Sequence, residues 1–143
     1  MGKKRIIKKG GGSEVSGTSK ALNRVPKKKV ATGVLNVQAT FNNTLLTLAD
    51  PKGNSIIAAS SGALGFRGAR KSTPFAAAKV GEVIGDKAQQ MGMKEASVVI
   101  RGVGAGRESA LRAFAGKGIA ITKIVDMTPV PHNGPRPKKA RRV

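Results

Sequence analysis

The 143-residue sequence has no cysteine, one histidine and few acidic residues, and each shortage excludes a class of protein. Without cysteine the chain forms no disulfide and no thiolate metal site, which favours the cytosol as its compartment. The lone His132 argues against a histidine-based metal site. No apolar run approaches the length that spans a bilayer, and the N-terminus shows no signal-peptide pattern. We therefore expect a protein without a metal or a membrane partner.

The seven acidic residues are also too scattered for catalysis. A sheet-based nuclease needs carboxylates that converge to hold metal ions, and the spacing here suggests no such pair. Glu82 and Asp86 are four residues apart on what reads as an exposed helix face. We expect no catalytic residue and no cofactor.

What the chain has in excess is positive charge. Its 27 Lys and Arg residues give a net charge of +20, which makes a polyanion, most commonly a nucleic acid, the expected partner. Residues 1–30 hold ten of these cations against one acid, and residues 129–143 hold five against none. The length predicts one domain, over residues 31–128, between a basic N-terminal arm and a basic C-terminal tail.

The hydrophobic pattern of this domain predicts an α/β fold with a mixed five-stranded sheet. Residues 34–41 alternate, with Leu35, Val37, Ala39 and Phe41 on the inner face, and Asn42-Asn43 is expected to form a two-residue hairpin turn. The expected strands cover residues 34–41, 44–49, 55–59, 96–100 and 119–125, and the expected helices cover residues 74–91 and a shorter stretch through residues 110–114.

The working centre is predicted to be the stretch of residues 60–78, which combines glycines with Arg67, Arg70 and Lys71 and contains no acid. Thr73 is placed to cap the following helix, with Pro74 at its first position. Glycines, cations and a helix start together indicate a phosphate-binding surface. A Walker A loop is excluded because Arg70 stands where its glycine is needed. An ordinary solvated surface loop is the alternative.

A second glycine loop, with Gly102, Gly104 and Gly106, also lies between a strand and a helix. Arg107 stands where the dinucleotide-binding fingerprint requires its third glycine, so we expect no dinucleotide site. One interpretation is a tight turn that exposes Arg107 to a polyanion. The other is that the glycines only allow close packing of helix and strand. If their strands are parallel, both loops emerge at the carboxyl edge of the sheet.

The two basic ends are expected to be extended and to bind RNA. The arm is expected to be disordered when free, or else to be merely solubilising. Prolines 129, 131, 135 and 137 favour an extended tail that threads between RNA segments, against the alternative of a frayed tail. Asn133 precedes Gly134, which offers little hindrance to succinimide formation, so we expect isoaspartate there unless packing restrains it.

Four stretches resemble the family of ribosomal protein eleven of the small subunit, in its bacterial form: residues 41–44, 65–77, 106–109 and 126–134. The resemblance covers roughly residues 31–143. It implies a ribonuclease-H-like three-layer α/β/α fold without catalysis, in the platform of the small subunit and near the mRNA path upstream of the decoding site. The implied partners are small-subunit rRNA and ribosomal proteins seven and eighteen. The chain departs from the family at Val103 and Ala105, where prolines are common, and at Pro135, where cysteine is frequent.

The residues expected to contact RNA come from these motifs and both ends: Lys27, Lys28, Lys29, Asn42, Asn43, Arg67, Arg70, Lys71, Ser72, Thr73, Arg107, His132, Asn133, Arg136, Lys138, Lys139, Arg141 and Arg142. A structural rRNA-binding protein is therefore the leading hypothesis. An enzyme on the same sheet and a free-standing DNA-binding protein are the alternatives. The second would need a recognition helix, and the long helix carries no basic face.

Overall fold

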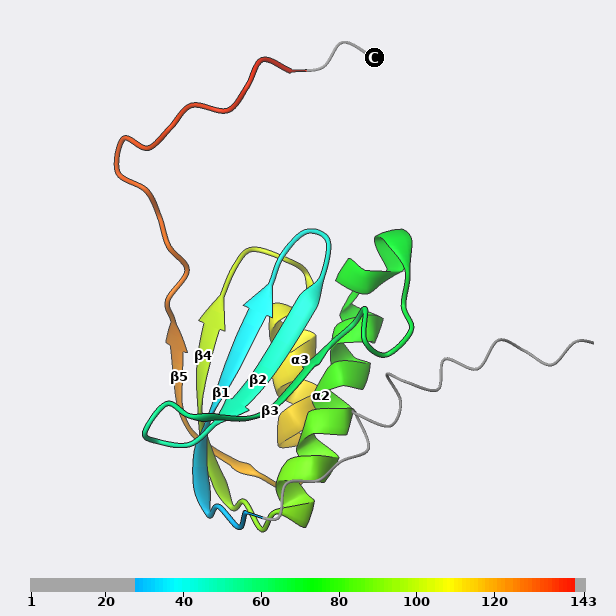
Figure 1. Cartoon of the computed structure of the whole chain (residues 1–143), viewed down its shortest axis with the longest axis vertical. Helices are drawn as coiled ribbons and strands as arrows, with labels where there is room; N and C mark the ends of the chain where they lie inside the picture. The colour runs from blue at the N-terminus through cyan, green and yellow to red at the C-terminus, as the bar shows by residue number, and fades with distance from the viewer. Residues whose placement is uncertain (1–27, 141–143) are drawn as a thin grey trace, which may run out of the picture.

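The computed structural model describes residues 28–140, which form an α/β domain followed by an extended tail (Figure 1). The elements are β1 (Thr32–Ala39), β2 (Thr44–Ala49), β3 (Ser55–Ser60), the 3-10 helix η1 (Gly68–Ser72), α2 (Pro74–Gln90), β4 (Glu95–Arg101), α3 (Gly106–Ala115) and β5 (Ala120–Asp126). The strands and α-helices follow the predicted order, and η1 was not predicted. The predicted α/β class and the mixed five-stranded sheet are confirmed.

The sheet has the strand order β3-β2-β1-β4-β5. Strands β1 and β2 pair antiparallel, as do β2 and β3, whereas β4 runs parallel to both β1 and β5. It follows that β1, β3, β4 and β5 all point the same way. Their carboxyl ends meet at one edge of the sheet, which we call the carboxyl edge.

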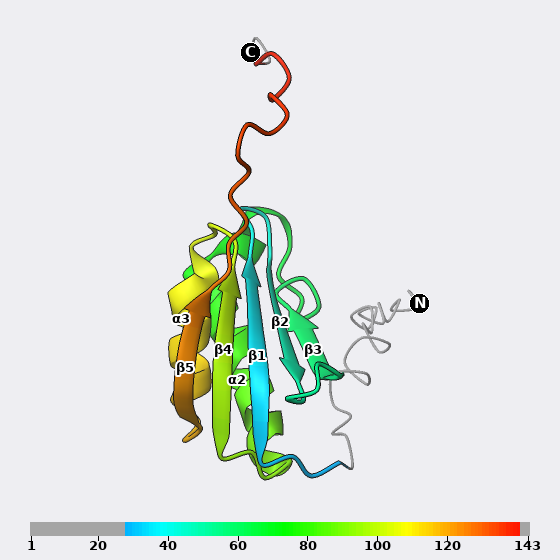
Figure 2. The same ribbon diagram turned by 90° about the vertical axis from the view of Figure 1, so that its left-hand side faces the viewer.

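Both helices lie on the same face of the sheet (Figure 2). Helix α2 packs against β2 and β3, α3 packs against β1 and β4, and the two helices pack against each other. The opposite face is not covered by a helix from residues 28–140. Of the three layers implied by the family resemblance, the described residues therefore supply two.

The alternation predicted for the strands produces the core between sheet and helices. Leu35 and Val37 of β1 pair with Leu48 and Leu46 of β2, and all four side chains are buried. From the helices, the fully buried side chains include Val80, Ile84, Ala110 and Phe114. A methyl group on Gly81 would lie 2.5 Å from the carbonyl oxygen of Ala110, so glycine is what lets α2 and α3 approach this closely.

The turn between β1 and β2 differs from the prediction by one residue. Thr40 and Asn43 close it, with the Thr40 N–H donating to the Asn43 carbonyl at 2.9 Å, so Phe41 and Asn42 form its tip. Phe41, predicted to extend the buried face of the strand, is therefore 75% exposed. Neither asparagine has a positive φ. Asn43 instead uses its side-chain oxygen to accept from the Thr44 N–H at 3.0 Å.

Candidate nucleic-acid interface

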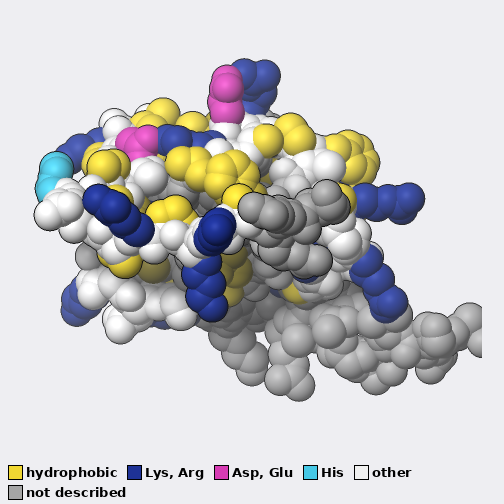
Figure 3. Space-filling view, turned by 90° about the horizontal axis from the view of Figure 1, so that it is seen from above, with side chains coloured by type: hydrophobic (Ala, Val, Ile, Leu, Met, Phe, Trp, Pro, Cys, Tyr) yellow, Lys and Arg dark blue, Asp and Glu magenta, His cyan; other side chains and the backbone are white. Residues whose placement is uncertain are grey.

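Four segments meet at the carboxyl edge because the strands that precede or follow them share a direction. They are the β1–β2 turn, the loop of residues 61–73, the loop of residues 102–105 and the tail that starts at Met127 (Figure 1). The expectation that both glycine loops emerge at this edge is confirmed. In the view onto it, Lys and Arg side chains surround exposed hydrophobic ones, with few acidic groups between them (Figure 3).

The loop of residues 61–73, here called the cationic loop, owes its path to glycine conformations. Gly65 has φ 95° and Gly68 has φ 62°, in the region that side chains other than glycine's rarely adopt. A Cβ atom at either position would meet nothing within 4 Å. Glycine is therefore required at both places by the backbone and not by crowding, and the space around the loop is left open.

A helix cap joins the cationic loop to α2. The Thr73 hydroxyl accepts from the Ala76 N–H at 3.3 Å and donates to the Arg70 carbonyl at 2.7 Å. Pro74 occupies the start of the helix, so the predicted cap and helix start are confirmed. Neither η1 nor α2 has an acid in its first turn. The partial positive charge of the helix start therefore adds to that of the loop's cations.

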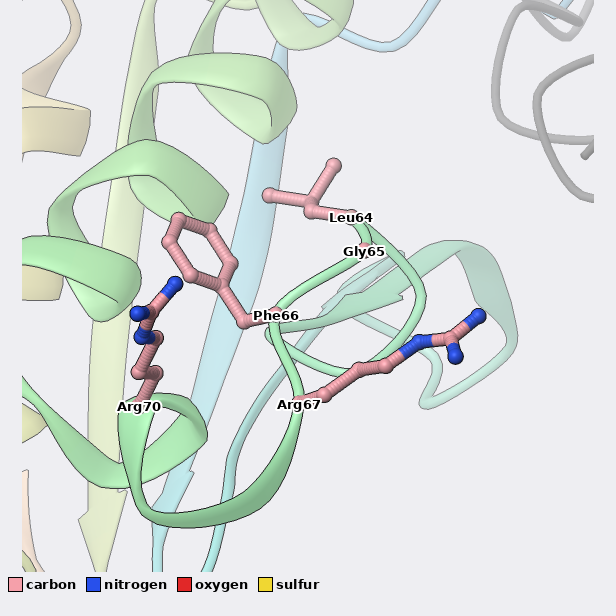
Figure 4. A pocket seen from close by; sticks show the side chains of 5 residues that line it. All are labelled: Leu64, Gly65, Phe66, Arg67 and Arg70. Carbon is pink, nitrogen blue, oxygen red and sulfur yellow. The ribbon is translucent and has the colours of Figure 1, made fainter. Parts of the chain in front are cut away.

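The three cations of this loop are available to a partner. Among the ion pairs of residues 28–140, none uses Arg67, Arg70 or Lys71. Arg67 and Arg70 are exposed, and Lys71 is half-buried. Arg70 runs beside Phe66 while Arg67 points the other way (Figure 4). With Leu64 and Gly65 these residues line an open hollow of about 450 Å³.

The second glycine loop is crowded where the cationic loop is open. Gly102 has φ 94°, and a Cβ atom there would overlap the Ala39 carbonyl oxygen. At Gly104 it would overlap the Thr40 carbonyl oxygen, and at Gly106 it would lie 2.5 Å from the Thr44 hydroxyl. The Gly104 N–H also donates to the Ala39 carbonyl at 2.9 Å. These contacts favour the interpretation that the glycines allow close packing against β1 and β2.

Arg107 follows this loop and differs from the expectation of a freely exposed cation. Its side chain is 33% exposed, and its guanidinium pairs with the carboxylate of Asp126 at the end of β5. The Asp126 carboxylate also accepts hydrogen bonds from the Thr128 hydroxyl at 2.6 Å and the Thr128 N–H at 3.0 Å. These bonds, and then Arg107, hold the pKa of Asp126 below its usual value. A contact between Arg107 and RNA stays a prediction, and it would compete with this pair.

The tail is fastened to the same edge before it departs from the domain. The Met127 N–H donates to the Ile100 carbonyl at 2.8 Å, and the Thr128 hydroxyl lies 3.4 Å from the Gly102 carbonyl. Residues 129–140 then run away from the sheet without regular structure, and all are exposed (Figure 1). Asn133 has φ 56°. Four other predicted RNA-binding side chains project along the tail: His132, Arg136, Lys138 and Lys139. Arg141 and Arg142 lie outside the described residues.

The remaining predicted residues are divided between the two edges. Asn42, Ser72 and Thr73 belong to the carboxyl edge, together with the structural Asn43. Lys28 and Lys29 precede β1 and therefore lie at the opposite edge, where Lys28 pairs with the buried Asp50. Lys27 lies outside the described residues. The structure thus brings most of the predicted set together and separates the lysines of the arm from it.

Sequence reasoning missed three groups at this edge. Phe75 in the first turn of α2 is 64% exposed, although it was given no role, and Phe41 is 75% exposed, although it was predicted to lie on the inner face of its strand. Lys79 lies over the Phe75 ring, with its nitrogen 5.7 Å from the ring centre. The sequence signal that could have drawn attention to Phe75 is its place directly after a helix cap in a cationic stretch. Among the described residues no three His, Asp or Glu side chains gather as metal ligands, and no helix is long and apolar enough to cross a membrane.

Two comparisons with known proteins point to one family. The profile of the family described as ribosomal protein S11 matches residues 33–142. A relative, the small ribosomal subunit protein uS11 of Leptothrix cholodnii (strain ATCC 51168 / LMG 8142 / SP-6), is 50% identical over 129 residues. That alignment covers 90% of this chain and 96% of the relative, so it includes the cationic loop, the second glycine loop and the start of the tail.

Proposed function

The chain belongs to the ribosomal protein S11 family, and we propose that it is a structural constituent of the small ribosomal subunit whose carboxyl edge binds small-subunit rRNA. The observation that carries the proposal is the cationic loop. Arg67, Arg70 and Lys71 stand on a capped, glycine-shaped loop, and none of them is neutralised by an acid of the described residues. Cations held in this way bind phosphates without first giving up a partner in the protein.

The tail extends this binding surface. It leaves the domain at the carboxyl edge, and its exposed cations continue the positive charge of the loop away from the sheet. An extended chain of this kind spans about 3.1 Å per residue, so residues 129–140 can contact RNA far from the domain. The loop would position the domain on the RNA, and the tail would thread between neighbouring segments.

The more specific assignments follow from the family. We propose that the protein lies in the platform of the small subunit, close to the mRNA path upstream of the decoding site, in the cytoplasm. Its protein neighbours there would be ribosomal proteins seven and eighteen. The proposed role is structural and not enzymatic, because the chain belongs to a family of ribosomal proteins.

A salt series on rRNA binding tests the proposal. The variant Arg67→Ala/Arg70→Ala/Lys71→Ala removes three phosphate contacts, and each contact contributes roughly 0.7 to the slope of log affinity against log salt. We expect the slope, measured by filter binding to small-subunit rRNA, to fall by about 2. Because the three side chains are not part of the core, thermal unfolding should stay unchanged.

The matched control is Lys52→Ala/Lys94→Ala/Lys123→Ala, which removes the same charge from exposed positions away from the carboxyl edge. It should leave the slope almost unaltered. Equal reductions in both variants would show that net charge alone binds RNA and would remove the cationic loop from the interface.

The N-terminal arm, we propose, adds affinity without sequence information. The cut that tests this should fall before Lys28, because Lys28 pairs with Asp50 and Val30 packs against the core. Deletion of residues 1–27 should reduce affinity at physiological salt while circular dichroism and cooperative unfolding remain unchanged. A loss of cooperative unfolding would show that the arm is structural.

A further inference from the structure

The aromatic residues of this chain are placed against the usual rule for burial. There are four phenylalanines and no tyrosine or tryptophan, and only Phe114 is in the core. Phe41, Phe66 and Phe75 all belong to segments of the carboxyl edge, and the first and third are 75% and 64% exposed. Leaving a phenylalanine in water forfeits about 2 kcal/mol of burial. Two such residues at one edge, with the half-buried Phe66 beside them, therefore indicate a partner that covers them.

Two of these rings form a fixed pair. Phe66 and Phe75 contact edge to face, with ring centres 6.1 Å apart and planes at 81°. Lys79 lies over the Phe75 ring and also pairs with Glu82 at 3.0 Å, so it covers part of that ring. Phe66 instead borders the hollow of about 450 Å³ between Leu64 and Arg70 (Figure 4). The pair thus orients Phe66 toward an open space.

The surroundings of the hollow select its occupant. Arg67 and Arg70 line it, Lys71 follows, and there is no acid between residues 60 and 78. A hydrophobic side chain of a partner protein would gain nothing from these charges. A nucleotide would, because its base offers a flat π-surface to Phe66 while its phosphate meets the arginines. The volume also lies within the range of about 300–1,000 Å³ that ligand pockets occupy.

We propose that this hollow receives an unpaired base of the rRNA, stacked on Phe66, with Arg70 beside it and the flanking phosphates on Arg67 and Lys71. The inference rests on the proposed function and deepens it: the cationic loop holds a splayed single-stranded nucleotide in addition to rRNA phosphates. The base must be unpaired because the faces of a base within a helix are already covered by its neighbours.

The test separates the base from its phosphate. Full-length protein is titrated with single-stranded oligoadenylate of about eight nucleotides and with an abasic ribose-phosphate oligomer of the same length. The wild-type protein should bind the base-containing oligomer about tenfold more tightly. Phe66→Leu should bring this ratio close to one, and Phe66→Tyr should keep it. The slope against salt should stay the same in all three proteins, because the phosphates and cations are unchanged.

Phe41→Leu is the matched control, since it removes an exposed aromatic of the same edge that does not line the hollow. It should leave the ratio at the wild-type value. Equal binding of the two oligomers by the wild-type protein overturns the inference, as does a ratio that falls with Phe41→Leu and not with Phe66→Leu. Equal binding would also fit an apolar protein partner for the hollow. The proposed function would survive such a result if the salt slope of rRNA binding still falls in the variant Arg67→Ala/Arg70→Ala/Lys71→Ala.

A second measurement does not depend on the folding of the leucine variant. An oligomer with 5-iodouridine is irradiated on the wild-type protein, and the cross-linked peptides are identified by mass spectrometry. Cross-links at Phe66 support the site. Cross-links confined to the peptide of Phe41, or to the tail, contradict it.

Discussion

Two loops of this molecule follow a strand of the sheet and lead into a helix, with three glycines and at least one arginine in the loop or in the first turn of that helix. In the cationic loop, the glycines at 65 and 68 adopt positive φ and face open space. In the second glycine loop, Gly102, Gly104 and Gly106 press against the ends of β1 and β2. The first arrangement leaves its cations to a partner, whereas the second fixes the domain and holds Arg107 in an ion pair.

The difference shows that glycine can serve two opposite purposes at one edge of a sheet. In an open loop it permits a backbone path and leaves room for a ligand. In a crowded loop it removes the side chain so that two parts of the protein can meet. The two loops also touch a common residue, because the Thr44 carbonyl accepts from the Ser61 N–H at 3.0 Å and the Thr44 hydroxyl lies under Gly106. The second glycine loop and the cationic loop are therefore connected through Thr44.

The largest expected effect is on stability, from Gly102→Ala. This substitution combines a positive φ with an overlap against the Ala39 carbonyl, and we expect it to lower the free energy of unfolding by about 3–5 kcal/mol. Gly65→Ala has a positive φ but no overlap, so we expect a loss of about 1–2 kcal/mol. Urea unfolding of the two variants measures the contrast. Equal losses would show that crowding does not distinguish the loops.

The next effect concerns RNA affinity and the tail. Truncation after Pro131 removes five cations without removing any core residue. We expect rRNA affinity at physiological salt to fall by at least tenfold, with little change in thermal unfolding. Filter binding and a salt wash of reconstituted small subunits measure the loss. If the truncated protein remains bound at raised salt, the tail does not anchor the protein and the cationic loop carries the binding alone.

A smaller effect should separate Arg67 from Arg107. Because Arg67 is not paired with an acid of the described residues, Arg67→Ala should lower the salt slope by about 0.7, the value of one phosphate contact. Arg107→Ala should lower it by less than half as much, since Asp126 already holds its guanidinium. Asp126→Asn should release Arg107 and raise the slope. A larger loss from Arg107→Ala than from Arg67→Ala would reverse the roles assigned to the two loops.

The smallest expected effect is on pH dependence. The pKa of Asp126 in the folded protein lies below its usual value of 3.8, mainly because of the hydrogen bonds from Thr128. The stability that this carboxylate contributes is therefore fully present above the unfolded pKa and is lost as the pH falls through the folded pKa. Urea unfolding from about pH 5 down to about pH 2 should show the wild type converging on Asp126→Asn. A constant difference over this range would contradict the assignment.

Much of the fold, and the position of the cationic loop within the candidate interface, was predictable from local patterns. Alternation along residues 34–39 marked β1, and Thr73-Pro74 marked the start of α2 through a cap that involves only neighbouring residues. The exposure of the cations in the loop and the extended form of the tail were predictable, because clustered charges and prolines constrain the chain over a few residues. The exposure of Phe41 was not, because a turn closed by Thr40 and Asn43 ended the alternation one residue earlier than the pattern indicated.

By itself, then, the sequence determined the order of the elements, the helix cap, the glycines at both loops and the concentration of cations at the ends and in residues 60–78. Tertiary structure alone decided which glycine loop is open and which is packed, since Gly102 meets Ala39 only after β4 has paired with β1. It also paired Arg107 with Asp126 and placed Lys28 at the far edge. The reason is physical: propensity and periodicity act over a few residues, whereas these contacts depend on strand order and register.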